Sequence, residues 1–276
     1  MWGEMSDRTP GSDLDWPPVQ ALNWVAASLE MSSEVIAVRP LAGGSWHATH
    51  VVTVREPGSQ VRDLVLRRWT RPGWQLEDAD FTPQREATAL KLIEGSSVPA
   101  PRLISVDSDG SSCDVPAILT DLIPGDPPGM KVDLDSFIAQ LAETLLAIHA
   151  LPGGARSPLP QYRPYHEDLV STLPPRWSGD PQLWLAAAAR IGGTRPPGAA
   201  SLIHRDYHPG NTLWRDGQLT GVVDWTQASL GPVSVDTATC AGTWPSDTDW
   251  ARRRASWPST DAWPRPGATI RLTGTS

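Results

Sequence analysis

The stretch between residues 202 and 236 constrains the fold of this chain more than any other part of it. A polar run from His204 to Asn211 contains Pro-Gly, which favours a loop over a helix. Two short apolar runs follow, and they flank an Asp-Gly pair at 216 and 217 that is a strong signal for a tight β-hairpin turn. Because a hairpin brings its two ends together, the loop that carries Asp206 is expected to lie beside Asp224.

Three oxygen-bearing side chains are therefore expected to converge, those of Asp206, Asn211 and Asp224. Mg²⁺ is a hard cation that takes oxygen ligands and usually binds through one or two protein groups together with substrate phosphates. Asn211 and Asp224 can supply such ligands, which leaves Asp206 to accept a proton from an attacking hydroxyl group. The spacing predicts phosphoryl transfer assisted by Mg²⁺.

The alternation of His204, Asp206 and His208 has a second interpretation, as a His/Asp metal cluster of a hydrolase. Such a site needs three or four converging ligands and open coordination positions. The chain has only 6 His, with no second histidine pair near this one. The hydrolase interpretation also explains neither Asn211 nor the hairpin spacing, so phosphoryl transfer is the favoured hypothesis.

The pattern His-Arg-Asp at 204–206, an Asn at 211 and an Asp at the end of a hairpin strand is the catalytic-loop arrangement of protein kinases. With His-Pro-Gly at 208–210, and with Gly231-Pro232 and Asp236 further on, the stretch resembles the aminoglycoside phosphotransferase family. Its members are small-molecule kinases with a protein-kinase-like fold. The resemblance runs from about Glu34 to Cys240. Where protein kinases have Asp-Phe-Gly, this chain has Asp-Trp-Thr.

The resemblance implies an α+β, bilobal protein-kinase-like fold, with a mixed-sheet N-lobe and a mostly helical C-lobe that is atypical at its end. The expected organisation is a flexible tail over 1–17, a nucleotide-binding N-lobe over 18–124, a C-lobe with the catalytic loop and acceptor site over 125–240, and an irregular tail over 241–276. The implied reaction moves the γ-phosphoryl of ATP to a hydroxyl of a small molecule. It depends on Mg²⁺ held by Asn211 and Asp224, with Asp206 as the base.

Two strands are expected on either side of Gly43, Gly44 and Ser45. In the kinase pattern, backbone N–H groups of such a turn cover the nucleotide phosphates. Two glycines and a serine also make an ordinary hairpin turn, so this assignment depends on the downstream motif. The resemblance further implies that Thr120 to Ile123, with Thr120 and Leu122 as the assigned residues, form a hinge that lines the nucleotide pocket.

The third strand, expected over 61–69, has no Lys where the kinase pattern places the phosphate-binding lysine. Strand parity puts Arg67 on one face and Arg68 on the other. Arg67 is therefore assigned the phosphate role, and Arg68 is expected to face solvent. Thr82-Pro83 is a good helix start, and Glu86 in the first turn of that helix occupies the position of the ion-pair partner.

Two residues of the motif are expected to be structural: His204 to brace the loop and Asp236 to hold its backbone. After Cys240 no helical stripe of apolar residues continues, and prolines interrupt the segment. We therefore expect this tail to pack poorly. It favours the alternative function, a non-catalytic nucleotide-binding remnant of such a kinase with a defective acceptor site.

Composition excludes several other classes of protein. A net charge of −8 argues against nucleic acid and anionic membranes as partners and mildly favours cationic substrates. The chain has 2 Cys, which do not make a disulfide framework, so a cytoplasmic location is expected. The first residues have the pattern of neither a signal peptide nor a membrane anchor. Neither the acceptor nor an oligomeric state follows from these patterns.

Overall fold

The computed structural model describes residues 16–29, 33–41, 47–74, 81–128, 133–151, 157–164, 174, 176–191 and 200–242. Gly43, Gly44 and Ser45 of the predicted phosphate loop lie outside these ranges, as does the segment 243–276. The chain divides into two compact units, Met1–Leu141 with Gly210–Gln227, and Ala142–Pro209 with Ala228–Ser276. Each unit is described by itself.

The first unit contains a five-stranded sheet in the order β1-β2-β3-β5-β4. Its strands are β1 (Glu34–Pro40), β2 (Ala48–Arg55), β3 (Val61–Arg68), β4 (Leu103–Asp107) and β5 (Ala117–Asp121). A mixed sheet is implied by the resemblance, but every described pairing is antiparallel. The reason is that β5 lies between β3 and β4, so β3 and β4, which run in the same direction, are not neighbours.

Helix α1 (Val19–Ala27) covers one face of this sheet. Its buried residues pack with apolar side chains of β2, β3 and β5 that share a face because strand side chains alternate. This core cluster comprises Ala21, Trp24, Val25, Val52, Val54, Leu64, Leu66, Cys113, Ala117 and Leu119. The burial removes apolar surface from water, which is the main favourable term in folding.

The prediction that Arg68 faces solvent is wrong. Arg68 lies on the face of β3 opposite to Arg67, as strand alternation predicts, but the residue is only 2% exposed. Its face of β3 is the one beneath α1, and its guanidinium forms a two-pronged ion pair with Asp114 in the loop before β5. Burial of a charge in a core is tolerated only with such a partner.

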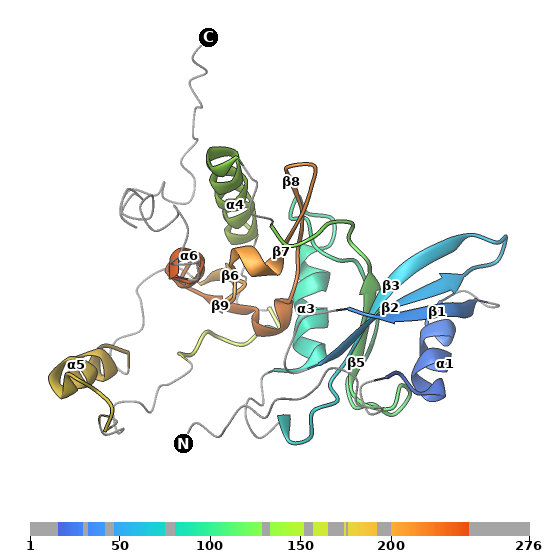
Figure 1. The fold of residues 1–276 in the computed structure, drawn as a ribbon, viewed down its shortest axis with the longest axis horizontal. Coiled ribbons are helices and arrows are strands. Elements are labelled where there is room, and N and C mark those ends of the chain that lie inside the picture. Colours follow the sequence, from blue (N-terminus) through green and yellow to red (C-terminus); the bar gives the residue numbers. More distant parts are fainter. Residues whose placement is uncertain are drawn as a thin grey trace, which may run out of the picture. The chain divides into compact units, whose positions relative to one another are not determined.

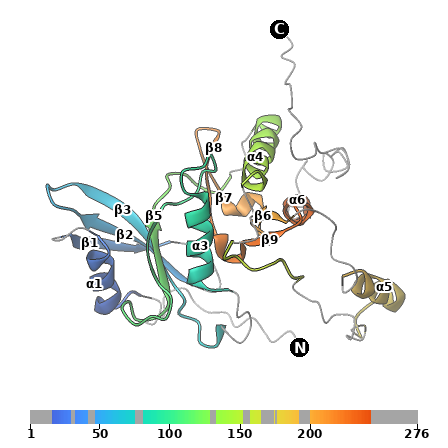
Figure 2. The ribbon, with the colours of Figure 1, turned by 180° about the vertical axis from the view of Figure 1, so that it is seen from behind.

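Helix α3 (Pro83–Ile93) packs against β4 and β5, and both views of the ribbon show it beside β5 (Figures 1 and 2). Thr82 caps it, since the Thr82 hydroxyl accepts a hydrogen bond from the Arg85 N–H at 3.1 Å. Pro83 stands at the first helical position, where its missing N–H has no cost. The predicted helix start is confirmed, and it determines where Glu86 lies.

A β-hairpin of β7 (Thr212–Arg215) and β8 (Gln218–Val222) also belongs to the first unit. Asp216 and Gly217 have φ angles of 51° and 75°, so both residues of the two-residue turn are left-handed, as the favoured hairpin turn requires. Trp214 stacks on Phe137 with ring centroids 4.3 Å apart. The predicted hairpin is therefore confirmed, and its two ends lie together.

The second unit contains a short antiparallel pair, β6 (Ser201–Ile203) with β9 (Ser229–Gly231), followed by α6 (Ser234–Gly242). Helix α5 (Pro181–Ile191) also belongs to this unit, and the long helix α4 (Leu134–His149) crosses from the first unit into the second. The α+β class is confirmed, while the predicted lobe and tail boundaries stay predictions. In the described part of the chain, no helix has the length and apolar character needed to cross a bilayer.

Candidate functional site

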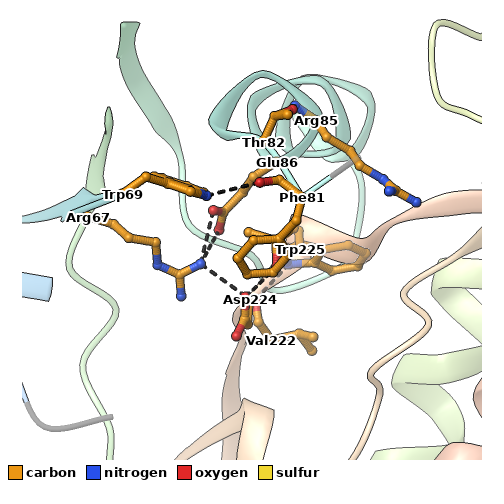
Figure 3. Close-up of polar contacts among 10 residues, drawn as sticks. Arg67, Trp69, Phe81, Thr82, Arg85, Glu86, Val222, Asp224 and Trp225 are labelled. Carbon is orange, nitrogen blue, oxygen red and sulfur yellow. Dashed lines mark hydrogen bonds and ion pairs between the residues drawn. The ribbon is translucent and has the colours of Figure 1, made fainter. Parts of the chain in front are cut away.

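In the first unit, Arg67 joins two acidic residues that are distant in sequence (Figure 3). Its Nη1 donates to both carboxylate oxygens of Glu86, at 3.2 and 3.0 Å, and to Oδ1 of Asp224 at 3.0 Å. The predicted Arg67–Glu86 ion pair is therefore present. The contact with Asp224 is a further one, which sequence reasoning did not predict.

The three charged groups are largely removed from solvent. The exposed fractions of the side chains are 16% for Arg67, 7% for Glu86 and 29% for Asp224. Burial raises the pKa of Glu86 against the opposing effect of Arg67. For Arg67, burial by itself would lower the pKa, but the charges of Glu86 and Asp224 raise it above its ordinary value. The guanidinium is thus a permanent cation held between two carboxylates.

Helix α3 positions Glu86 beside Arg67, and it also binds the segment that follows Asp224. The 3₁₀ turn η3 (Trp225–Gln227) packs against α3, and Arg85 Nη2 donates to the backbone carbonyl of Gln227 at 3.0 Å. The backbone N–H of Trp225 donates to Glu86. Adjacent residues of one helix therefore bind the turn at two points. Arg85 was missed by sequence reasoning because its partner is a backbone oxygen far along the chain.

Asp224 has a left-handed backbone, with φ of 66°, which is uncommon for a residue other than glycine. Its Oδ1 accepts a hydrogen bond from the Thr226 hydroxyl at 2.7 Å. The indole of Trp225, fully buried, donates from Nε1 to the Val222 carbonyl at 2.9 Å. The hydrogen bonds of the Thr226 and Trp225 side chains thus stabilise the left-handed backbone at Asp224. Backbone strain of this kind is a frequent feature of functional sites.

Asn211 precedes β7, and its backbone carbonyl accepts a hydrogen bond from the Val223 N–H at 2.9 Å. The hairpin thereby ties Asn211 to the residue immediately before Asp224. An amide oxygen and a carboxylate are donors suited to Mg²⁺, so these two residues fit a magnesium site completed by substrate phosphates. The hydrolase alternative requires a cluster of at least three metal ligands. Within the described residues, no group of three or more His, Cys, Asp or Glu side chains could hold a metal ion.

Of the two predicted hinge residues, Thr120 lies on the same face of the sheet as Arg67. Thr120 on β5 pairs with Val65 on β3, two positions before Arg67, so strand alternation puts Thr120 on the face of Arg67. Leu122 follows directly after β5. Their role in nucleotide binding stays a prediction.

In the second unit, Asp236 on α6 organises the polar loop. Its fully buried carboxylate accepts hydrogen bonds from the backbone N–H groups of His204 at 2.9 Å and Arg205 at 2.6 Å. His149 at the end of α4 contacts the same carboxylate through Nε2 at 3.0 Å. The prediction that Asp236 holds the loop backbone is confirmed, and His149 is an additional partner of that residue.

Asp206 has a partly exposed carboxylate, with 44% of its side chain accessible. Its backbone N–H donates to Nδ1 of the buried His204 at 3.3 Å, so His204 braces the loop as predicted. His208 Nε2 lies 3.7 Å from the Asp206 carboxylate. Asp206 is therefore held by its backbone while its carboxylate stays accessible, which is what a general base requires.

A family model described as the phosphotransferase enzyme family, APH, matches residues 37–268. The chain belongs to this family. The match extends beyond the end at Cys240 that the motifs indicated, into the segment for which no helical stripe is seen in the sequence. No curated protein gives a significant match.

Solved structures show the same fold as this phosphotransferase family member. The macrolide 2′-phosphotransferase MphH of Brachybacterium faecium is 21% identical, with a TM-score of 0.57 over 85% of this chain and 81% of that one. A thermostable mutant of the aminoglycoside phosphotransferase APH(4)-Ia, in a ternary complex with AMP-PNP and hygromycin B, is 15% identical, with a TM-score of 0.60 over 87% and 81%. An aminoglycoside-3′-phosphotransferase of type VIII is 20% identical, with a TM-score of 0.53 over 87% and 91%.

Proposed function

We propose that this phosphotransferase moves the γ-phosphoryl group of ATP to a hydroxyl group of a small molecule in a reaction that depends on Mg²⁺. The observation that carries the proposal is the ion-pair network of Arg67, Glu86 and Asp224. It joins a strand, a helix and the end of a hairpin, and the same hairpin begins beside Asn211. A network of a buried cation and two carboxylates suits a site for a polyphosphate and a divalent metal.

The residues have separate roles in this proposal. Arg67, steadied by Glu86, binds the nucleotide phosphates, and Gly43, Gly44 and Ser45 cover them. Asn211 and Asp224 hold Mg²⁺, which when bound neutralises charge on the transferred group.

Asp206 orients the acceptor hydroxyl and takes its proton. Thr120 and Leu122 line the pocket for the base of the nucleotide.

The proposed acceptor is a cationic small molecule with several hydroxyl groups. The net charge of −8 favours such a ligand electrostatically. Structures with the same fold include a macrolide 2′-phosphotransferase and a complex with hygromycin B, and both names point to hydroxyl-bearing antibiotics as acceptors to test first.

A screen of hydroxyl acceptors tests the proposal. Purified protein is incubated with Mg²⁺, ATP and single acceptors, beginning with hygromycin B, other aminoglycosides and macrolides, and the phosphorylated product is detected by mass spectrometry. We expect a product whose mass is increased by one phosphoryl group, which depends on Mg²⁺ and forms far more slowly with Asp206→Asn. Nucleotide binding without any phosphorylated acceptor would instead support the non-catalytic alternative.

A further inference from the structure

The contacts of Arg67 distinguish this site from one that carries a lysine at the same position. A lysine has one nitrogen, whereas a guanidinium has three, arranged as a rigid fork. In this chain one of them, Nη1, makes all three hydrogen bonds to Glu86 and Asp224. Among the described residues, Nε and Nη2 of Arg67 make no hydrogen bond or ion pair. The fork can therefore contact an anion while it is still bound to both carboxylates.

Asp224 Oδ1 is occupied by two donors, Arg67 Nη1 and the Thr226 hydroxyl. Arg67 must therefore move away from this oxygen before a metal ion can bind to it. If a metal ion used the other oxygen, two cations would share one carboxylate at short distance, and their repulsion in a largely buried site would weaken metal binding.

The net charge of the cluster formed by Arg67, Glu86 and Asp224 also indicates that a metal ion binds weakly without nucleotide. Arg67 contributes one positive charge, and Glu86 and Asp224 contribute two negative charges, so the cluster carries a net charge of about −1. A divalent metal alone would convert this to about +1 in a site with little solvent. Nucleotide phosphates bring the balancing negative charge, and they also offer acceptors to the unused nitrogens of Arg67.

We infer that Arg67 is a placeholder cation, which occupies Asp224 in the unliganded protein and yields it to the metal only when nucleotide phosphates draw the guanidinium away. The metal and the nucleotide then bind as a coupled pair, and the metal alone binds weakly. The inference rests on the proposed function, because it takes Asp224 as a metal ligand and Arg67 as a phosphate ligand.

The test measures Mn²⁺ binding to unliganded protein by electron paramagnetic resonance, with no nucleotide present. The informative variant is the double substitution Arg67→Gln with Glu86→Gln. It removes the placeholder but keeps the net charge of the cluster at about −1, since one charge of each sign is lost. Substitution of Glu86 together with Arg67 also avoids leaving the buried Glu86 carboxylate without its ion-pair partner. We expect Mn²⁺ to bind the double variant about 5- to 150-fold more tightly than the wild type, as for a typical coupling between two sites.

Two further variants complete the test. Arg67→Lys keeps a cation beside Asp224 and is expected to bind Mn²⁺ as weakly as the wild type. Arg55→Gln removes an exposed arginine of β2 that pairs with Glu34, and it should leave Mn²⁺ affinity unchanged. Equal Mn²⁺ affinity in the wild type and the double variant overturns the inference, as does tight Mn²⁺ binding by the unliganded wild type. Failure of the acceptor screen would count against the proposed function and leave these binding results standing.

Discussion

Arg67 and Arg68 are neighbours with the same chemistry, yet the structure gives them different surroundings. Successive side chains of a strand point to opposite faces. Arg67 faces Glu86 and Asp224, whereas Arg68 lies on the face covered by α1 and pairs with Asp114. We therefore expect Arg67 to govern ligand binding and Arg68 to govern stability.

Arg68→Met should lower the free energy of unfolding by about 3 kcal/mol, because it leaves the partly buried Asp114 carboxylate without its cationic partner. Nucleotide affinity of the folded protein should not change. Urea denaturation measures the first quantity, and calorimetric titration with Mg²⁺ and AMP-PNP measures the second. The control is Arg55→Met, which breaks an exposed pair and should cost less than about 1 kcal/mol. Equal losses in the two variants would contradict the structural role assigned to Arg68.

His47 provides a residue-scale prediction on pH. Its ring stacks on Phe81 and meets Trp69 edge-on, with centroids 5.0 and 4.5 Å away. Burial, with the nearby charge of Arg67, lowers the pKa of His47 from 6.5 to about 3. The unfolded chain then binds a proton below pH 6.5 that the folded chain does not, so the free energy of unfolding should fall as the pH falls from 6.5 towards 3.

The matched variant for this prediction is His47→Gln, which cannot titrate. Urea denaturation at pH 7, 6, 5 and 4 should show a smaller loss of stability for the variant than for the wild type. Parallel pH profiles would mean that His47 does not contribute to acid sensitivity.

At the scale of elements, the β7–β8 hairpin positions Asn211 and Asp224, and two glycines set its geometry. Gly217 in the turn has φ of 75° and open space where a Cβ would be placed. Gly125, in the segment after β5, has φ of 146°, and a Cβ there would lie 2.6 Å from the Thr220 hydroxyl. Asp126, its neighbour, exchanges backbone hydrogen bonds with Trp214. The segment after β5 is therefore fastened directly to the hairpin.

Gly217→Ala should lower the free energy of unfolding by about 1 kcal/mol, since only the left-handed backbone opposes it. Gly125→Ala should cost more, about 3 kcal/mol, because a steric clash adds to the unfavourable backbone conformation. Urea denaturation of the two variants provides the comparison. A Gly217→Ala effect as large as that of Gly125→Ala would show that close packing of the hairpin on the segment after β5 is not important.

At the scale of the whole molecule, the assigned residues are divided between the two compact units. Arg67, Glu86, Asn211 and Asp224 belong to the first unit, and Asp206 belongs to the second. The residues proposed to bind the nucleotide and the metal are thus supported by one set of packing contacts, and the proposed base by another set, centred on Asp236. Ligand binding and phosphoryl transfer should therefore be separable by mutation.

Asp206→Asn keeps the size of the side chain and removes the proton acceptor. Turnover should fall by about 10² to 10⁴-fold, the usual contribution of a positioned acid or base. Affinity for Mg²⁺ and AMP-PNP should stay close to that of the wild type. Steady-state kinetics with an acceptor identified by the screen, combined with calorimetric titration, gives both values. Unchanged turnover would remove Asp206 as the base, and loss of nucleotide affinity would contradict the separation of roles.

The sequence by itself determined the features that depend on local rules. The Asp-Gly turn, the Thr-Pro helix start and the alternation along β3 are set by conformational preferences of a few neighbouring residues, and all three are confirmed. They were sufficient to predict the hairpin that joins Asn211 to Asp224 and the helix start that places Glu86, whereas the pairing of Arg67 with Glu86 was implied by the resemblance to the kinase pattern. Tertiary structure alone decided which faces are covered. The ion pair of Arg68 with Asp114, the hydrogen bond from Arg85 to Gln227 and the contact of Arg67 with Asp224 each join residues that are far apart in the chain. A partner of this kind leaves no periodic or spacing signal, because burial and charge pairing are determined only once the elements have packed.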